Sequence, residues 1–357
     1  METPFWEGGP EPIRGTTYPL TDDALLDWYA TSMGMRAVRV MICWEAIQDN
    51  PNPLPAPPVA AGAMGAIPVA TGGRQIYWTD LVQLVIRLID RGIYVAVCPW
   101  QHNPASSNTD ITYRGLGFEP EHFADFWGKF ATAINASIAA GFPPDPRFPA
   151  DAARPDRLAF DLINEPHEAV GGADVGISFA GWQACAQQAI NAIRADAGNQ
   201  NTILVEGMGF ASARLDRSQA DLGDPESALW KGLADPLGNL AISVHCYEGT
   251  RILPGEAAAE KPADAMRKAC DDLVGWARGH GLKVHIGEVA VDAGVGGCSS
   301  LPQAQDKWAD WNDFCRDNDD VLMGWNWWAN TSKNWGWPDE GSCQVGKPDI
   351  AGGRNWR

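Results

Sequence analysis

Residues 158–167 read Leu-Ala-Phe-Asp-Leu-Ile-Asn-Glu-Pro-His, a mostly apolar run that ends in a polar pair and a proline. This pattern is typical of a short buried strand that stops at the proline. The strand would hold the amide of Asn164 and the carboxyl group of Glu165 at its C-terminal tip. In a closed barrel of parallel strands, that tip lies on the face where catalysis takes place. Glu165 is therefore the first candidate catalytic residue.

A second glutamate follows another strand-like segment. Residues 282–288 read Leu-Lys-Val-His-Ile-Gly-Glu, in which Val284 and Ile286 alternate with polar residues. Glu288 comes about three strand–helix units after Glu165, at roughly 35–40 residues a unit. Strands three apart in a ring of eight face each other across its mouth. Two carboxyl groups that meet there suit cleavage of a glycosidic bond, which needs one proton donor and one nucleophile or base. The alternative is that both glutamates lie in exposed loops.

Strand-like and helix-like segments alternate along almost the whole chain. Eight strands are predicted, at Ile13–Thr17, Ala37–Cys43, Ile93–Cys98, Leu158–Ile163, Thr202–Glu206, Leu240–His245, Val284–Gly287 and Val321–Trp328. Longer helices are predicted at 21–34, 78–90, 120–140, 178–197, 263–279 and 303–317, the first capped by Thr21. This order predicts an α/β protein, a single (β/α)8 TIM barrel with long βα loops that forms one catalytic domain over residues 1–357. An open doubly wound sheet is the alternative, but it favours a Gly-x-Gly-x-x-Gly turn, which is absent.

Composition fits a large core with extended loops. Hydrophobic residues make up 45% of the chain, and the 38 glycines and 26 prolines cluster between the periodic segments. The Pro/Ala/Gly-rich insertion 51–73 and the C-terminal segment 329–357 are expected to be irregular.

Charge limits the partners. The formal net charge is −18, which argues against nucleic acid and anionic membranes, and no apolar run is long enough to span a membrane. Seventeen Trp against six Tyr favours stacking platforms for sugar rings in addition to core positions. We expect a β-linked polysaccharide or oligosaccharide as the only partner of a monomer.

The first 20 residues lack the apolar region of a signal peptide. The protein is therefore either cytoplasmic or secreted with a signal peptide absent from this sequence, and we expect a secreted, extracellular protein.

The eight cysteines are too few for a dense disulfide scaffold at this length. Cys43, Cys98 and Cys246 fall in strand-like runs and are expected to be buried thiols. Cys298 and Cys343 lie in Gly/Ser-rich loops after the last two strands, and we predict that they pair. No Cys-x-x-Cys or His-x-x-x-His spacing occurs, so no metal and no cofactor are expected.

Further polar and aromatic residues lie at the predicted strand ends. Arg39 lies within a strand, where a buried arginine requires an anion, and a catalytic carboxylate or a structural ion pair would supply it. His245 and Tyr247 form an i, i+2 pair on one face of another strand, and a tyrosine hydroxyl there would keep a nearby nucleophile ionised. Aromatic residues end two more strands, at Trp100 and in Trp325-Asn-Trp327-Trp328.

These residues taken in order resemble glycoside hydrolase family five, the cellulase A group among the retaining (β/α)8 glycosidases. Residues 158–167 fit the family's signature throughout. The resemblance implies that Glu165 is the acid/base, that Asn164 bonds the sugar 2-hydroxyl, and that Glu288 is the nucleophile.

The resemblance also extends to other positions. Arg39, His245 and Tyr247 fall on family positions, and Trp328 best matches the family's eighth-strand tryptophan, with Trp327 as the second choice. The family usually has a histidine directly at the third strand tip. In this chain Gln101 follows Trp100 and His102 comes one place later, so the match is shifted there. We place these three residues and Trp44 in the substrate-binding set.

The reaction expected from the resemblance is double displacement on a β-1,4-glucan by a retaining endoglucanase. Glu288 would attack the anomeric carbon, and Glu165 would donate and later remove a proton, with its pKa raised by the nearby charge of Glu288. An endo-β-1,4-mannanase or another β-glycanase of the family is the alternative. A non-catalytic glycan-binding barrel would need neither glutamate. A metal-dependent hydrolase would have to use His102, His245 and His285, although no His-x-His pair is present.

Overall fold

Seven parallel strands form one curled sheet in which every strand pairs with its neighbours in sequence. The computed structural model describes Arg14 and residues 22–32, 34–48, 63–68, 72–100, 120–141, 154–167, 177–213, 226–247, 265–290 and 301–327. Within them the strands are β1 Ala37–Cys43, β2 Tyr94–Trp100, β3 Leu158–Asp161, β4 Thr202–Glu206, β5 Leu240–Tyr247, β6 Lys283–Ala290 and β7 Leu322–Trp327. Because β1 also approaches β7, the sheet curls round on itself. This is the predicted (β/α)8 barrel, and apart from Arg14 its predicted first strand lies outside the described residues.

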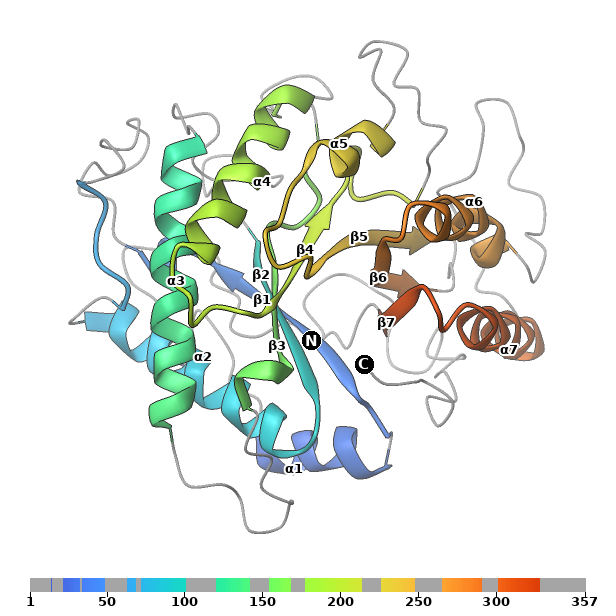
Figure 1. The fold of residues 1–357 in the computed structure, drawn as a ribbon. Coiled ribbons are helices and arrows are strands. Elements are labelled where there is room, and N and C mark those ends of the chain that lie inside the picture. The colour runs from blue at the N-terminus through green and yellow to red at the C-terminus, as the bar shows by residue number, and fades with distance from the viewer. Residues whose placement is uncertain are drawn as a thin grey trace, which may run out of the picture.

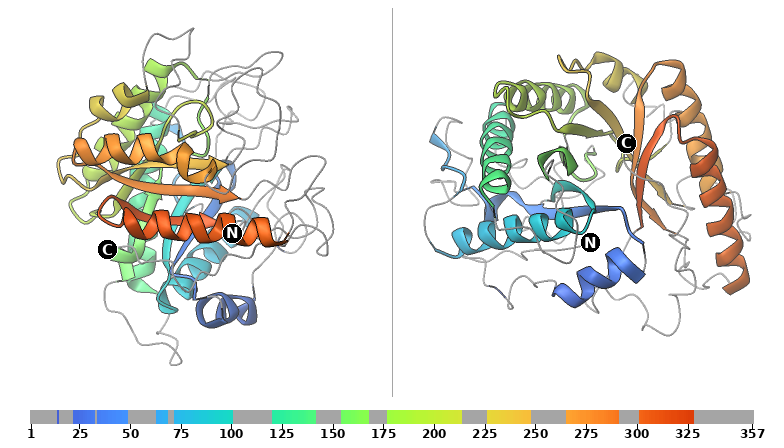
Figure 2. Two further views of the ribbon diagram at one scale, coloured as in Figure 1. Left: turned by 90° about the vertical axis from the view of Figure 1, so that its right-hand side faces the viewer. Right: turned by 60° about the horizontal axis from the view of Figure 1, so that its bottom comes forward.

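Helices follow the strands and cover the outside of the sheet (Figures 1 and 2). They are α1 Asp23–Asp27, α2 Gly72–Asp90, α3 Pro120–Ala140, α4 Phe179–Arg194, α5 Glu226–Gly232, α6 Ala265–Gly279 and α7 Leu301–Asp317. Short turns are the π-helix η1 Trp28–Ser32 and the 3-10 helices η2 Trp44–Ala46 and η5 Arg154–Arg157. None of the helices described has both the length and the apolar content needed to cross a membrane.

Two predicted helix starts are corrected. Asp22, and not Thr21, caps α1, since its carboxylate accepts the Leu25 N–H at 2.7 Å. Helix α2 begins at Gly72, within the insertion that was expected to be irregular. Tyr77 explains the longer helix, because its side chain is fully buried and its hydroxyl accepts the Cys43 N–H at 3.0 Å. Core contacts therefore begin before Trp78.

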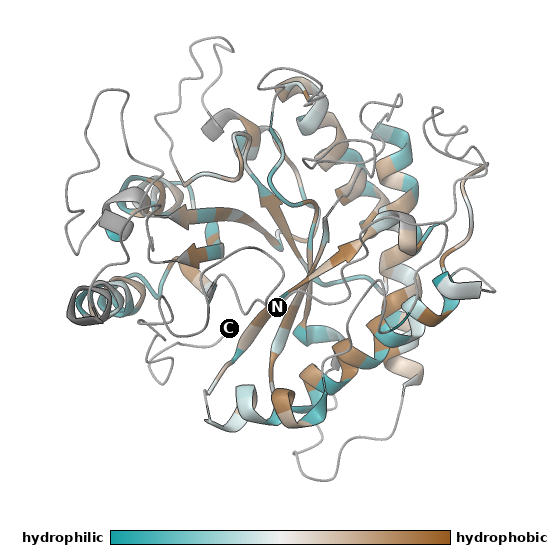
Figure 3. Cartoon of the chain, turned by 180° about the vertical axis from the view of Figure 1, so that it is seen from behind, coloured by the Kyte–Doolittle hydropathy of each residue, from teal (hydrophilic) through white to brown (hydrophobic). Residues whose placement is uncertain are grey.

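The main core lies between the strands and the helices. Its largest group of rings comes from η2, α3 and β3, where Phe126 stacks on Phe130 at 5.4 Å and Trp127 lies 5.6 Å from Phe160. The strands are predominantly apolar, whereas the helices carry both polar and apolar stretches (Figure 3). This is the pattern of a sheet that is buried beneath amphipathic helices.

A second, smaller apolar cluster consists of four residues on neighbouring strands, Ala96, Ala159, Leu204 and Ala241. Side chains two positions apart on a strand share a face, so the next residues on this face are polar: Cys98, Asp161, Glu206 and Ser243. The interior of the sheet therefore carries a small apolar floor, the four residues of the second cluster, with a polar layer toward the C-terminal ends of the strands. The candidate catalytic residues lie at that end.

Candidate active site

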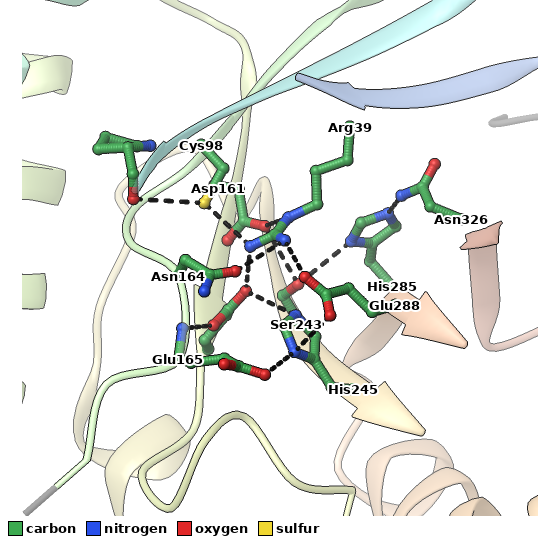
Figure 4. Close-up of polar contacts among 12 residues, drawn as sticks. Arg39, Cys98, Asp161, Asn164, Glu165, Ser243, His245, His285, Glu288 and Asn326 are labelled. Carbon is green, nitrogen blue, oxygen red and sulfur yellow. Dashed lines mark hydrogen bonds and ion pairs between the residues drawn. The ribbon is translucent and has the colours of Figure 1, made fainter. Parts of the chain in front are cut away.

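Arg39 is the centre of the polar layer (Figure 4). Its Nη1 donates to Oε1 of Glu288 and to Oδ1 of Asn164, both at 2.9 Å. Its Nε donates to Oδ2 of Asp161 at 2.7 Å, and its Nη2 lies 2.5 Å from Oε1 of Glu206. The side chain is 3% exposed. The predicted pairing of Arg39 with a candidate catalytic carboxylate is confirmed, and two further acids share the guanidinium.

The charge of Arg39 is stable in this setting. Burial opposes the charged form, but the carboxyl groups of Asp161, Glu206 and Glu288 outweigh it and raise the pKa of Arg39 well above its ordinary value. The Cys98 thiol lies 2.9 Å from Nη2. Burial raises the pKa of this thiol well above its ordinary value, so it stays protonated.

The two candidate catalytic glutamates come from separate strands and meet at His245. Nδ1 of His245 lies 2.7 Å from Oε1 of Glu165 and 3.4 Å from Oε2 of Glu288. One carboxylate oxygen of each glutamate and a ring nitrogen of His245 all lie within 4.8 Å of one another. The Glu165 side chain is 32% exposed, whereas that of Glu288 is 5% exposed. The pair therefore has one solvent-facing and one buried carboxylate.

Local backbone irregularities aim both groups. Glu165 has a φ of 47°, a left-handed conformation that non-glycine residues rarely adopt. On the opposite side, the β5–β6 register shifts between Val244 and His245, which places Glu288 opposite His245. A Cβ on Gly287 would lie 3.1 Å from Nε2 of His245, so glycine lets this close approach occur.

The predicted direction of the Glu165 pKa is wrong. Burial favours its neutral form, but the hydrogen bond from His245 and the charge of that ring outweigh burial, so the pKa of Glu165 is lowered. Burial also opposes charge on His245, yet the carboxylates of Glu288 and Glu206 raise the pKa of His245 well above its ordinary value. The imidazolium thus outweighs the repulsion expected between the two glutamates.

Asp161 holds a proton at a pH where an ordinary aspartate has lost it. Burial raises its pKa to about 7 against the opposing effect of Arg39. The residue is 0% exposed, and its Oδ1 has no hydrogen-bond partner within the described structure. A buried oxygen without a donor favours the protonated acid.

His285 lies away from the glutamate pair, as predicted. Its Nδ1 is 3.2 Å from Ser243 Oγ and its Nε2 is 2.8 Å from Nδ2 of Asn326. Burial keeps it neutral by lowering its pKa well below the ordinary value. His285 therefore takes no part in the group formed by Glu165, His245 and Glu288. Cys98, Asp161 and Glu206 form a second group of residue types that can bind a metal ion. They surround the guanidinium of Arg39, whose positive charge occupies the place that a metal ion would take.

Trp44 is a correction to the predicted substrate-binding set. Its indole is 0% exposed, and it packs 4.8 Å from the ring of Phe126 while Nε1 donates to Gln48 at 2.8 Å. A ring enclosed in the core offers no face to a sugar. The sequence showed only that Trp44 follows a strand, and the direction of the chain after the strand places it toward α3.

The remaining predicted residues are not described in full. Gln101, His102 and Trp328 lie outside the described residues, as do Cys298 and Cys343. Trp100, Tyr247 and Trp327 end β2, β5 and β7, and only their backbone is described. Their predicted roles stay predictions. Cys43, Cys98 and Cys246 are buried thiols, which confirms that expectation.

The sequence interpretation missed Glu206 and Asp161. Glu206 ends the predicted strand Thr202–Glu206, and so carried the same strand-tip signal as Glu165. Asp161 interrupts an apolar run, and a charged residue there indicates an internal ion pair.

Comparisons with known proteins show which family the sequence matches. The family model described as cellulase (glycosyl hydrolase family 5) matches residues 150–331. Endoglucanase 1 of Robillarda sp. (strain Y-20) is 29% identical over 223 residues, which cover 62% of this chain and 47% of the relative. Endoglucanase 1 of Saitozyma flava is 27% identical over 208 residues, covering 57% and 50%. The chain thus matches about half the length of these curated relatives.

Solved structures support the fold. An endo-beta-1,4-glucanase from Xanthomonas axonopodis pv. citri superposes with a TM-score of 0.65 at 21% identity, covering 98% of this chain and 93% of that chain. XacCel5A in complex with cellopentaose gives a TM-score of 0.64 at 20% identity, with 95% and 91% covered. At such identities these likenesses concern the fold.

Proposed function

Because the chain belongs to glycosyl hydrolase family 5, we propose that it is an endo-β-1,4-glucanase that hydrolyses its substrate with retention of anomeric configuration. The observation that carries the proposal is that Glu165 and Glu288 both approach Nδ1 of His245, with one carboxylate oxygen of each within 4.8 Å of the other. Carboxyl groups of retaining glycosidases lie about 5–5.5 Å apart, and those of inverting enzymes about 6.5–9.5 Å. The observed distance supports retention, since no water fits between an attacked carbon and a base this close.

Glu288 is the proposed nucleophile. It is nearly buried and accepts a hydrogen bond from Arg39, whose charge favours the carboxylate form of the acid. In the first step it bonds to the anomeric carbon while the bond to the leaving oxygen breaks, which gives a glycosyl-enzyme. Water then attacks this intermediate and releases Glu288.

Glu165 is the proposed acid/base. It must carry a proton when the leaving oxygen departs and must remove one from water in the second step. Its pKa is lowered in the free protein. A bound sugar ring would exclude water from its partly exposed carboxyl group, and that desolvation would raise the pKa toward the value that proton donation needs.

Asn164 is proposed to bind the sugar next to the scissile bond. Its Oδ1 accepts from Arg39, which leaves the Nδ2 end of the amide as the donor directed away from the guanidinium. A hydrogen bond from this donor to the 2-hydroxyl would strengthen as the oxocarbenium-like state develops.

Release of reducing ends from soluble carboxymethylcellulose, β-mannan and xyloglucan tests this function. We expect the cellulose derivative to be preferred, with a rapid fall in viscosity and unchanged rates in the presence of a chelator. Proton NMR during hydrolysis of cellopentaose should show the β-anomer of the product first. Preference for mannan would contradict the glucanase assignment and support an endo-β-1,4-mannanase instead. Initial release of the α-anomer would contradict retention.

A further inference from the structure

Glu206 connects the two halves of the proposed active site, although its strand supplies none of the predicted catalytic groups. It ends β4 and is 0% exposed. Its Oε2 accepts the backbone N–H of Glu165, and its Oε1 lies 2.5 Å from Nη2 of Arg39 and 3.2 Å from Nε2 of His245. One buried carboxylate thus contacts three residues from three other segments.

We propose that Glu206 is a positioning residue that holds the acid/base Glu165 and the His245 ring in their working arrangement; this rests on the proposed glycosidase function. It acts through other groups and does not itself touch the substrate. Its removal would therefore change the rate of chemistry more than the binding of the glycan.

The backbone of Glu165 is the first contact that supports this role. The left-handed conformation at Glu165 persists only where surrounding groups hold it. Glu206 accepts the N–H of this residue, and Nδ1 of His167 lies 3.0 Å from its carbonyl oxygen. Adjacent Asn164 donates its own N–H to the Pro99 carbonyl at 3.1 Å. The turn that aims the Glu165 carboxyl group is thus held from β4 on one side and from its own loop on the other.

The His245 ring is the second contact. Its two nitrogens face different acids: Nδ1 faces Glu165 and Glu288, while Nε2 faces Glu206. Glu206 is among the groups that raise the pKa of His245. An imidazolium with carboxylates at both nitrogens keeps one ring orientation, and the ring in turn orients Glu165.

Asp161 provides the comparison within the same layer. It also is fully buried and pairs with Arg39, but its described hydrogen bonds go to Arg39 and Ser243. Replacing either Asp161 or Glu206 would therefore remove a partner of Arg39. Contact with the Glu165 backbone and with His245 is particular to Glu206.

The test is Glu206→Gln, which keeps the shape and removes the charge. Arg39 and His245 approach Oε1 and the Glu165 N–H approaches Oε2, so in either orientation the new NH2 group faces at least one donor. We expect kcat on a soluble cello-oligosaccharide to fall about 100-fold, the size of effect expected when a catalytic group moves by about 1 Å, with KM changed less than threefold. We also expect NMR of ring-labelled histidine to show a lowered pKa for His245.

Val205→Ala on the same strand is the matched control, because it removes a buried side chain and leaves the polar layer intact. It should lose stability while keeping kcat and the His245 pKa. Glu206→Asp retains charge but is too short to reach both Glu165 and Arg39, so it should lower kcat at least tenfold while His245 keeps its raised pKa. If Glu206→Gln does not fold, this variant decides the matter.

A Glu206→Gln protein with parental kcat and parental His245 pKa would overturn the proposal, as would a Glu206→Asp protein with parental kcat. A parent protein that hydrolyses no β-glycan would instead refute the proposed function. The histidine titration needs no substrate and would still measure the contact with His245, so the two failures are distinguishable.

Discussion

Nδ1 of His245 lies 2.7 Å from Oε1 of Glu165, so the proposed proton donor of the reaction is itself hydrogen-bonded to a buried imidazole. This pairing lowers the pKa of Glu165. Glu165 therefore loses its proton at a lower pH than a buried glutamate without such a partner would. The pH dependence of catalysis should therefore respond to His245.

Replacing His245 by Gln removes the positive charge of the imidazolium beside Glu165. It also leaves the negative charges of Glu206 and Glu288 near Glu165 without the imidazolium that balances them. Both changes raise the pKa of Glu165. Since Glu165 must be protonated to act as an acid, the alkaline limb of kcat/KM should move to higher pH, while the maximal rate falls because Glu165 is less well oriented. A pH–rate profile on a cello-oligosaccharide measures this. An unmoved limb, or one at lower pH, would contradict the pairing.

The roles of the two glutamates can be separated by azide. Glu288→Ala should lose on the order of 10⁴-fold or more in kcat, and azide entering the vacated side should give an α-glycosyl azide. Glu165→Ala should retain turnover of substrates with a good leaving group, and azide should give the β-glycosyl azide. Product configuration by NMR distinguishes the two, and the reverse pattern would exchange the assignments.

Arg39→Met should lower the free energy of unfolding by about 3–5 kcal/mol at neutral pH, because Asp161, Glu206 and Glu288 lose their common cation while buried. The loss should be smaller at about pH 5, because Asp161, whose pKa is about 7, is then protonated and needs no cation. Urea titrations at both pH values measure it. Arg39→Lys, a control that keeps the charge, should recover only part of the loss since it lacks the planar fork. Equal losses at both pH values would argue against uncompensated acids.

Asp161 should contribute its own pH dependence to stability. Its pKa is about 7 when folded and 3.8 in the unfolded reference, so the unfolded chain releases this proton first. The stabilisation is complete below about pH 4, falls as pH rises through about 7, and then levels off. Relative to Asp161→Asn, the parent should lose about 2–3 kcal/mol between about pH 5 and 8. A constant difference across this range, measured by urea unfolding, would show that Asp161 is already ionised.

Trp44 should behave as a core residue. Trp44→Ala should lower the free energy of unfolding by about 3–5 kcal/mol, since the ring is enclosed by Phe123 and Phe126. KM for cello-oligosaccharides should stay within about twofold, measured below the unfolding transition. Exposed Trp28 offers a control in which the same substitution should cost far less stability. A large rise in KM would restore the sugar-binding role predicted from sequence.

Strand order and strand-tip chemistry were predictable from sequence, because parallel strands bring their C-terminal ends to one face whatever the loops do. Glu165 and Glu288 could be paired on that basis alone. The direction of the Glu165 pKa shift could not be predicted from sequence, because it depends on which acid the His245 ring approaches. The register shift beside His245 decides this. Glu206 was available from the same reasoning and was missed. The monomeric state, the secreted location and the single-domain assignment stay predictions.

The apolar floor of Ala96, Ala159, Leu204 and Ala241 limits which substitutions the interior of the sheet can accept. Three of its four side chains are single methyl groups, and the guanidinium above them touches groups from four strands. Adding bulk at any of the alanines would displace a cation shared by several acids, and the disturbance would reach both ends of the reaction at once. We therefore expect a change of substrate to involve residues outside this layer and to leave its charges as they are.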